Sequence, residues 1–390
     1  MKPHIALGLI GLTCLAFLPL KGFEKQNITI RGSFDNSRLK FETKHTGRVA
    51  FIGGSITEMN GYRPMMMEFL QNRYPHTDFE FINAGISSTC STTGAFRLSR
   101  DVLSKGEIDL LFLEFAVNDD QDAGHSLEAC IRGMEGIIRN LRTHYPDADV
   151  IVTYFVNPRM LEQLQKGKTP LSMGAHEEVL ETYQISRIHL ARELATQIQK
   201  GKFTWNEFGG THPKQPGNRL CADMHQRLFE LAWSGSVPTN TRKHAIPKSL
   251  LDKNSYSRGR FLSPSKVDLQ EGWKFSEPEW KEISGSKRSR YLGFPLLHTD
   301  DSGKRIHIQF EGKAIGAFVL AGPDAGKIKY NIDEVHEGTI DLYHHYSKNL
   351  HYPRTIMFAH NLKPGKHRMT LEVIKSEDRK AVRIMEFCIN

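Results

Sequence analysis

The stretch VAFIGGSIT, residues 49–57, decides how the first half of the chain folds. Its four leading apolar residues are typical of a buried strand of a parallel sheet. Two glycines come next, so Ser55 lies at the carboxyl end of the strand, where parallel α/β sheets bind their ligands. On its own the pattern is more typical of a glycine-rich turn with a helix-capping serine. A function for Ser55 therefore depends on which residues stand at the ends of the other strands.

Strand and helix patterns alternate from residue 46 to residue 235. Short apolar runs predict further strands at 79–82, 109–115 and 150–155. Helices are expected from Pro64 to before Pro75, and over residues 127–141, 177–199 and 217–233, with steps of three and four between apolar residues in the second. This alternation predicts an α/β unit with a mostly parallel sheet covered on both faces.

The remaining chain changes character twice. Residues 236–265 are rich in Pro, Ser and basic residues, which predicts a linker or a strap over the surface. After residue 266 apolar residues alternate with polar ones, as in Ile306, Ile308 and Phe310, and turn residues separate the runs. Residues 266–390 are therefore expected to form an all-β sandwich.

Charge is distributed unevenly along the 390 residues. Residues 1–235 contain 26 basic and 26 acidic side chains, whereas residues 236–390 contain 26 and 18, which accounts for the whole net charge of +8. A nucleic-acid partner is not expected, because the basic excess is confined to one module. The five cysteines show no CxxC pair and no Cys/His cluster in the sequence, so no metal site and no cofactor are expected.

The N-terminus carries the only long apolar run. A short basic start followed by residues 5–20 is typical of a secretory signal, so residues 1–23 are interpreted as a signal peptide. A secreted or periplasmic protein is expected, with no membrane contact beyond this segment.

Three further segments place polar groups at the edge where Ser55 lies. The third strand leads to Asn118, whose side-chain amide can stabilise an oxyanion, although an Asx turn also explains it. The neighbouring carboxylates are more typical of solvated strand ends than of a cation site; they are Glu114, Asp119, Asp120 and Asp122. The loop 83–88 after the second strand can present a backbone N–H. His212, on a glycine-rich loop before the last helix, can act as a base for a serine hydroxyl. Their order after successive strands favours a site over coincidence.

These four segments resemble the sequence blocks of the SGNH hydrolase superfamily, also called GDSL-type esterases, over residues 46–235. The resemblance implies a three-layer α/β/α flavodoxin-like fold and ester hydrolysis, often deacetylation of carbohydrates. It assigns Ser55 as the nucleophile and His212 as its base. It also implies an oxyanion hole formed by the amides of Ser55 and Ser88 and by Asn118. The C-terminal region resembles, less specifically, β-sandwich modules that accompany carbohydrate esterases.

One departure from the family pattern affects the mechanism. The family has an acid three residues before the histidine, where this chain has Gly209. Glu207 is the first candidate to replace this acid, and Asp223 is another. The site could also work without an acid, as a Ser–His dyad. We favour Glu207 or a dyad over loss of activity. Arg63 and Arg97, near the first two blocks, are candidates for substrate contact.

The sequence thus predicts a secreted serine esterase that removes O-acyl groups, chiefly acetyl, from a polysaccharide or another acylated carbohydrate. The alternative is a catalytically degenerate carbohydrate-binding or surface protein on the same scaffold. A lipase ranks lower, because the sequence has no long apolar lid. The basic C-terminal module is expected to meet an anionic glycan. Its aromatic side chains are candidates for sugar contact, although packing explains them as well; they include Trp273, Trp280, Tyr343, Tyr346, Tyr352 and the pair His344 and His345.

Overall fold

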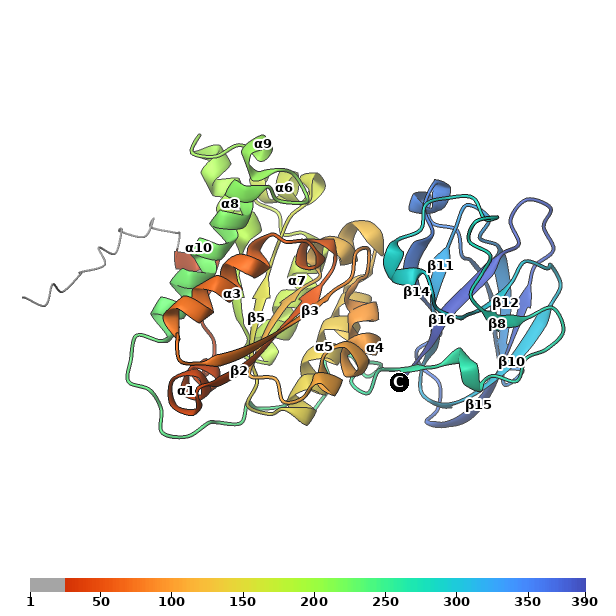
Figure 1. Ribbon diagram of the computed structural model, residues 1–390, viewed down its shortest axis with the longest axis horizontal. Helices are drawn as coiled ribbons and strands as arrows, with labels where there is room; N and C mark the ends of the chain where they lie inside the picture. The colour runs from red at the N-terminus through yellow and green to blue at the C-terminus, as the bar shows by residue number, and fades with distance from the viewer. Residues whose placement is uncertain (1–24) are drawn as a thin grey trace, which may run out of the picture.

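The computed structural model describes residues 25–390, and the expected signal peptide, residues 1–23, lies outside them. Figure 1 shows an α/β module and a C-terminal β module side by side, with an extended segment running between them. Among the helices of the described part of the chain, none has the length and apolar character needed to cross a bilayer.

A six-stranded sheet forms the centre of the first module. Its order is β1-β6-β5-β4-β2-β3, with β2 to β6 parallel and only β1 antiparallel. The expected strands are confirmed as β2 to β5. The bounds are β1 Ile28–Thr29, β2 Thr46–Gly53, β3 Asp78–Gly85, β4 Leu110–Glu114, β5 Asp149–Thr153 and β6 Ser186–Ile188. Because β4, β2 and β3 are neighbours in the sheet, the segments after them emerge side by side.

Helices cover both faces of this sheet (Figure 1). On one face α3 packs against α10, and on the other α5 packs against both α4 and α7. The longer helices are α3 Tyr62–Arg73, α4 Ser91–Asp101, α5 Leu127–His144, α6 Pro158–Gln165, α7 Leu171–Thr182, α8 Leu190–Gln199 and α10 Gln215–Ala232. The short helical segments are α1 Asn36–Leu39, α2 Ser55–Glu58 and α9 Trp205–Phe208, the π-helical turns η2 Lys40–Lys44 and η4 Asn118–Asp122, and the 3₁₀ turns η1 Lys25–Asn27 and η3 Leu103–Lys105.

The helix expected over residues 177–199 is wrong as a single element. It is divided into α7 and α8 by the strand β6, which pairs with β5 and β1. Gln184, with φ of 51°, ends the first helix in the left-handed region. Ile185 and Ile188 are then buried as sheet residues. A short strand between two helices keeps the spacing of apolar residues close to that of a helix, so the sequence pattern alone predicted one continuous helix.

The C-terminal module consists of two antiparallel sheets, as expected. One has the order β10-β15-β12-β13 and the other β14-β11-β16-β9-β8, with β7 also paired to β16. In β10 the residues Ile306, Ile308 and Phe310 are buried. The bounds are β7 Arg260–Leu262, β8 Lys274–Ser276, β9 Leu296–Thr299, β10 Arg305–Gly312, β11 Ile315–Ala321, β12 Lys327–Ile332, β13 His336–Asp341, β14 Tyr352–Ala359, β15 Gly365–Val373 and β16 Val382–Ile389, with 3₁₀ turns η5 Pro264–Lys266, η6 Ser289–Tyr291 and η7 His345–Lys348.

The segment expected as a linker, residues 236–265, is closely attached to both modules. His244 Nε2 lies 3.0 Å from Oδ1 of Asp149, a residue of the α/β sheet. Tyr256 packs against Phe96 of α4. Residues 260–262 are not linker, because they form β7 and pair with β16.

The two modules share packed residues around α4. Phe318 and Cys388 of the β module are buried in the same apolar cluster as the α/β core. The hydroxyls of Thr93 on α4 and Thr355 on β14 lie 2.9 Å apart, and Arg100 lies 3.4 Å from Glu386. The β module therefore packs directly against the helix that follows the Ser88 loop.

Candidate active site

Ser55 begins α2 directly after β2, and its side chain is half-buried. Close neighbours leave no room for a side chain at the two preceding residues, which are therefore glycines. A Cβ added at Gly53 would lie 2.2 Å from Oε1 of Glu114, and one added at Gly54 would lie 2.1 Å from Oδ1 of Asn118. Larger residues at these positions would displace the groups that surround the serine. The Gly-Gly-Ser pattern is thus explained by space as well as by the turn.

His212 meets Ser55 across 157 residues of chain. Its Nε2 lies 2.7 Å from the Ser55 Oγ, which is a hydrogen bond of good length. A neutral imidazole that accepts the serine O–H through Nε2 is the arrangement needed to activate the hydroxyl. Because His212 is exposed, the pair is open to a substrate from solvent. The structure therefore brings together the predicted nucleophile and base.

The other ring nitrogen of His212, Nδ1, has no hydrogen-bond partner within residues 25–390. Glu207 is occupied elsewhere: its Oε2 accepts hydrogen bonds of 2.7 Å from both the N–H and the hydroxyl of Thr204, as part of a capping box on α9. Asp223 forms an ion pair with Arg219 one helical turn away. The expectation that Glu207 orients His212 is therefore wrong in this arrangement. The geometry corresponds to the dyad.

Gly209 cannot simply be replaced by the acid that the family pattern has at this position. Its φ is 102°, in the region that favours glycine, and an added Cβ would lie 2.2 Å from the backbone nitrogen of Lys214. The neighbouring Gly210, with φ of 87°, has no atom within 4 Å of an added Cβ. The backbone conformation and the close Lys214 nitrogen thus leave no room for an acid at Gly209.

Ser88 occupies a backbone position that favours glycine. Its φ is 69°, which an L-residue adopts only at a cost of about 1–2 kcal/mol. Arg288 of the C-terminal module holds the loop, since its guanidinium donates over 3.0 Å both to the carbonyl of Ser87 and to Oγ of Ser88. The Ser87 hydroxyl and N–H in turn donate to Glu58. The Ser88 loop is therefore fixed from both modules.

Asn118 is buried at the start of η4, and its side chain is held in one orientation. Its Nδ2 donates to Oδ2 of Asp122 over 2.8 Å, and Oδ1 of Asp122 accepts from the hydroxyl of Tyr352 over 2.7 Å. An amide has two N–H groups, so one remains for an oxyanion. Tyr352 was expected as a possible sugar contact, but it is 2% exposed and acts in this chain of hydrogen bonds. No sequence signal pointed to this contact between the modules.

Glu114 ends β4 beneath the Ser55 turn and is fully buried. Its Oε1 accepts from the Gly54 N–H over 2.9 Å and from the Thr57 hydroxyl over 2.7 Å. Its Oε2 has no hydrogen-bond partner in the described structure. Burial raises the pKa of Glu114 to about 7, against the opposing effect of these hydrogen bonds. The expectation of solvated carboxylates is therefore wrong for Glu114, which supports the turn.

Asp119, beside Asn118, is also buried. Its Oδ1 accepts from the Ser91 N–H over 2.8 Å, and its Oδ2 accepts from Nε2 of His176 over 2.8 Å. Burial opposes ionisation, but the imidazoles of His125 and His176 hold the pKa of Asp119 below its ordinary value. Asp119 thus ties the Asn118 segment to the start of α4, which follows the Ser88 loop.

The two arginines expected to contact substrate lie in different environments. Arg97 is fully buried and donates to the carbonyls of Ala84 over 2.6 Å and Gly53 over 3.0 Å. Its expected substrate contact is wrong, because the guanidinium is used to hold the ends of β2 and β3. Arg63 is half-buried and donates to Oδ1 of Asn60 over 2.9 Å.

Comparisons with known proteins agree with this architecture. Residues 51–220 match the GDSL-like Lipase/Acylhydrolase family. A two-domain esterase (CEX) described as active on acetylated mannans, crystallised with mannopentaose, superposes with a TM-score of 0.76 at 19% identity over 95% of this chain and 98% of that one. The same esterase without that ligand in its description gives a TM-score of 0.73 at 19% identity, over 94% and 98% of the two chains. No curated protein matches the sequence. The expected SGNH hydrolase fold with a C-terminal all-β module is confirmed.

Proposed function

Because residues 51–220 form a domain of the GDSL-like lipase/acylhydrolase family, we propose that the protein is a serine esterase that removes O-acyl groups, chiefly acetyl, from carbohydrate. The observation that carries this proposal is the 2.7 Å contact between His212 Nε2 and the Ser55 Oγ. A serine hydroxyl and an imidazole at this distance, beside buried amide donors, suit acyl transfer.

In the proposed mechanism the Ser55 Oγ attacks the ester carbonyl while His212 takes its proton. The oxyanion accepts hydrogen bonds from the N–H groups of Ser55 and Ser88 and from the free Nδ2–H of Asn118. Collapse of the tetrahedral intermediate breaks the bond to the sugar oxygen, which takes the proton from the His212 imidazolium and leaves as a hydroxyl. Water then attacks the acyl-enzyme with His212 again as the base, which releases the acid and restores Ser55.

His212 would perform these steps as a Ser–His dyad. In a triad the acid fixes the tautomer and stabilises the imidazolium. Here the Ser55 hydroxyl is the hydrogen-bond partner of the His212 ring among the described residues. The exposure of His212 allows water to solvate the imidazolium instead, so the proposal does not require a hidden acid.

Acetylated polysaccharide is the proposed substrate class. The fold likeness to the esterase described as active on acetylated mannans extends over both modules, which supports a two-module carbohydrate esterase. The proposed anionic glycan partner rests on the charge of residues 236–390, that is, the segment 236–265 together with the β module, which carry all of the net +8. Binding of a sulfated glycan by the full chain should weaken as salt is raised, because exposed charges are screened within about 10 Å at 0.1 M.

We also propose export to the periplasm or the medium, on the basis of residues 1–23. N-terminal sequencing of the mature protein from the medium or periplasm tests this. A chain recovered only from the cytoplasm, with residues 1–23 intact, would contradict it.

Two assays test the esterase directly. Wild type should release acetate from acetylated mannan and hydrolyse p-nitrophenyl acetate, and Ser55→Ala should lose at least a thousandfold in kcat. The matched control is Ser234→Ala, since Ser234 is an exposed serine just after α10 whose hydroxyl, within the described residues, bonds only to Leu231 O. Equal rates for wild type and Ser55→Ala would rule out Ser55 as the nucleophile.

The competing function is a carbohydrate-binding protein on a degenerate hydrolase scaffold, and the missing acid partner of His212 favours it. A fluorophosphonate probe separates the two. Labelling that is lost in Ser55→Ala but kept in Ser234→Ala supports the esterase. Glycan binding without any labelling of the folded wild type supports the binding protein.

A further inference from the structure

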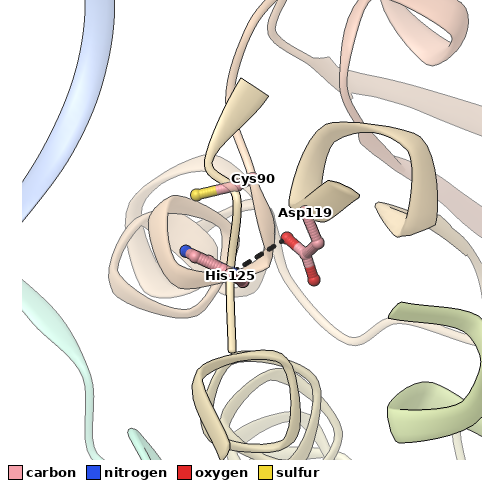
Figure 2. Close-up of side chains that lie close together, drawn as sticks. All are labelled: Cys90, Asp119 and His125. Carbon is pink, nitrogen blue, oxygen red and sulfur yellow. Dashed lines mark ion pairs between the residues drawn. The ribbon is translucent and has the colours of Figure 1, made fainter. Parts of the chain in front are cut away.

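A group of metal-ligating side chains lies next to the two loops that carry Ser88 and Asn118. Cys90, Asp119 and His125 offer one sulfur, one oxygen and one nitrogen that all lie within 4.8 Å of one another. Figure 2 shows the three side chains converging from separate segments, with His125 facing Asp119. Cys90 and Asp119 are buried, and the side chain of His125 is 15% exposed.

His125 and Asp119 form an ion pair that is longer than a usual charged hydrogen bond. Nδ1 of His125 lies 3.4 Å from Oδ1 of Asp119, and this buried nitrogen has no hydrogen-bond partner among the described residues. A charged N–H···O⁻ bond is typically about 2.7–2.9 Å long. A tetrahedral Zn²⁺ with bonds of about 2.0–2.1 Å to nitrogen and oxygen separates such atoms by about 3.3 Å. The gap therefore fits two ligands of one ion.

Neighbouring groups hold the donors in place. The Ser91 N–H and His176 Nε2–H both donate to Asp119 over 2.8 Å, and Oγ1 of Thr92 lies 3.4 Å from Nε2 of His125. Outer hydrogen bonds of this kind orient carboxylate and imidazole ligands in metal sites. The His125 nitrogen that faces Asp119 is the one left without a hydrogen-bond partner in residues 25–390.

We propose that Cys90, Asp119 and His125 bind one Zn²⁺ ion through Sγ, Oδ1 and Nδ1, with water as the fourth ligand. A thiolate, an imidazole and a carboxylate form a donor set that suits Zn²⁺ and not Mg²⁺ or Ca²⁺. Binding displaces the thiol proton of Cys90 to solvent and uses the neutral imidazole of His125. The ion does not touch Ser55; it joins the segments that follow Ser88 and precede α5.

A second overlapping group, formed by Asp119, Cys130 and His176, is the weaker candidate. There the imidazole and the carboxylate already form a direct hydrogen bond of 2.8 Å, which a metal ion would have to break. His176 of this group instead supports the proposed site, because it donates to Asp119 from outside it.

The test uses the tag-free full-length protein, incubated with one equivalent of Zn²⁺ and dialysed against metal-free buffer. Wild type is expected to retain about one zinc per chain by mass spectrometry, and Cys90→Ser and His125→Ala to retain less than a tenth of that. The matched control is Cys221→Ser. Cys221 is also a buried cysteine beside a histidine, with its sulfur 3.6 Å from Nδ1 of His225, and this variant should retain as much zinc as wild type.

A measurement on wild type alone guards against misfolded variants. Co²⁺ in place of Zn²⁺ should give a thiolate-to-cobalt charge-transfer band, and Zn²⁺ should slow alkylation of Cys90. Both readouts are independent of esterase activity. Wild type that keeps no zinc and shows no cobalt–thiolate band would overturn the proposal, as would folded Cys90→Ser that binds as much zinc as wild type.

Discussion

The hydroxyl of Tyr352, in the β module, donates to Asp122 of the α/β module over 2.7 Å, and Asp122 in turn holds the amide of Asn118. Tyr352 and Asp122 are 230 positions apart. The proposed oxyanion donor is therefore oriented by a side chain of the other module, and Arg288 holds the Ser88 loop in the same way. The β module thus takes part in the geometry of the site.

Tyr352→Phe is expected to lower kcat about tenfold with little change in KM. The substitution keeps the packing of the ring but removes the hydrogen bond to Asp122, so Asn118 loses part of its orientation. The expected effect is smaller than the hundredfold to thousandfold loss for removal of an oxyanion donor. Steady-state kinetics on p-nitrophenyl acetate measure it.

The matched control for this variant is Tyr343→Phe, in the same module. The Tyr343 hydroxyl makes no hydrogen bond within residues 25–390, so this variant should match wild type. If Tyr352→Phe keeps full kcat while the control behaves normally, Asp122 positions Asn118 without help from the β module.

Stability should fall as pH rises from about 4.5 to about 7 because of Glu114. Burial raises its pKa to about 7 in the folded protein, against 4.5 in the unfolded chain. In this window the folded state keeps a proton that the unfolded state has lost, so deprotonation favours unfolding. The effect is at most about 3.5 kcal/mol, at about 1.4 kcal/mol per pKa unit.

Glu114→Gln should remove this slope, because an amide keeps the acceptor oxygen for Gly54 and Thr57 but does not titrate. Urea unfolding of both proteins at pH 5, 6, 7 and 8 gives the comparison. The stability of the variant relative to wild type should rise from pH 5 to about pH 7 and level off by pH 8. Parallel stability curves for the two proteins would mean that Glu114 is already ionised at pH 5.

Gly209→Asp should not restore a triad and should destabilise the loop. A Cβ there would meet the Lys214 nitrogen at 2.2 Å, and φ of 102° disfavours any L-residue. Backbone strain of this kind costs about 1–3 kcal/mol, and the close contact with the Lys214 nitrogen adds to that cost. Gly210→Asp is the control, because it shares the positive φ but has open space.

Thermal unfolding should therefore show a larger drop in Tm for Gly209→Asp than for Gly210→Asp. Neither variant should exceed wild type in kcat/KM. A higher kcat/KM for Gly209→Asp would show that the loop readily adopts the path of a triad enzyme.

Arg97→Lys should reduce the free energy of unfolding by about 2–4 kcal/mol and leave KM unchanged in the folded fraction. A lysine cannot make the paired hydrogen bonds by which the Arg97 guanidinium holds the carbonyls of Gly53 and Ala84. Buried polar groups left unpaired cost about 1–3 kcal/mol each. Urea unfolding and KM on the same preparations check both expectations, and a raised KM with unchanged stability would instead favour substrate contact.

The alternation of apolar strands and amphipathic helices was enough to predict the parallel sheet and the place of the site. Ser55, Ser88 and Asn118 follow strands that are neighbours in the sheet, and parallel strands bring their carboxyl ends to one edge. The same local patterns predicted the period-two strands of the β module. These features depend on periodicity and turn residues, which are local properties of the sequence.

Tertiary structure alone decided which groups the site residues meet. The bonds between Thr204 and Glu207 follow a local Thr-x-x-Glu capping pattern. By contrast, the bond from Tyr352 to Asp122 and the convergence of Cys90, Asp119 and His125 left no sequence pattern. The last two join segments from different elements or modules, so they depend on how those elements pack. The lack of an acid partner for His212 likewise follows from the backbone path at Gly209, where space and a positive φ exclude the acid.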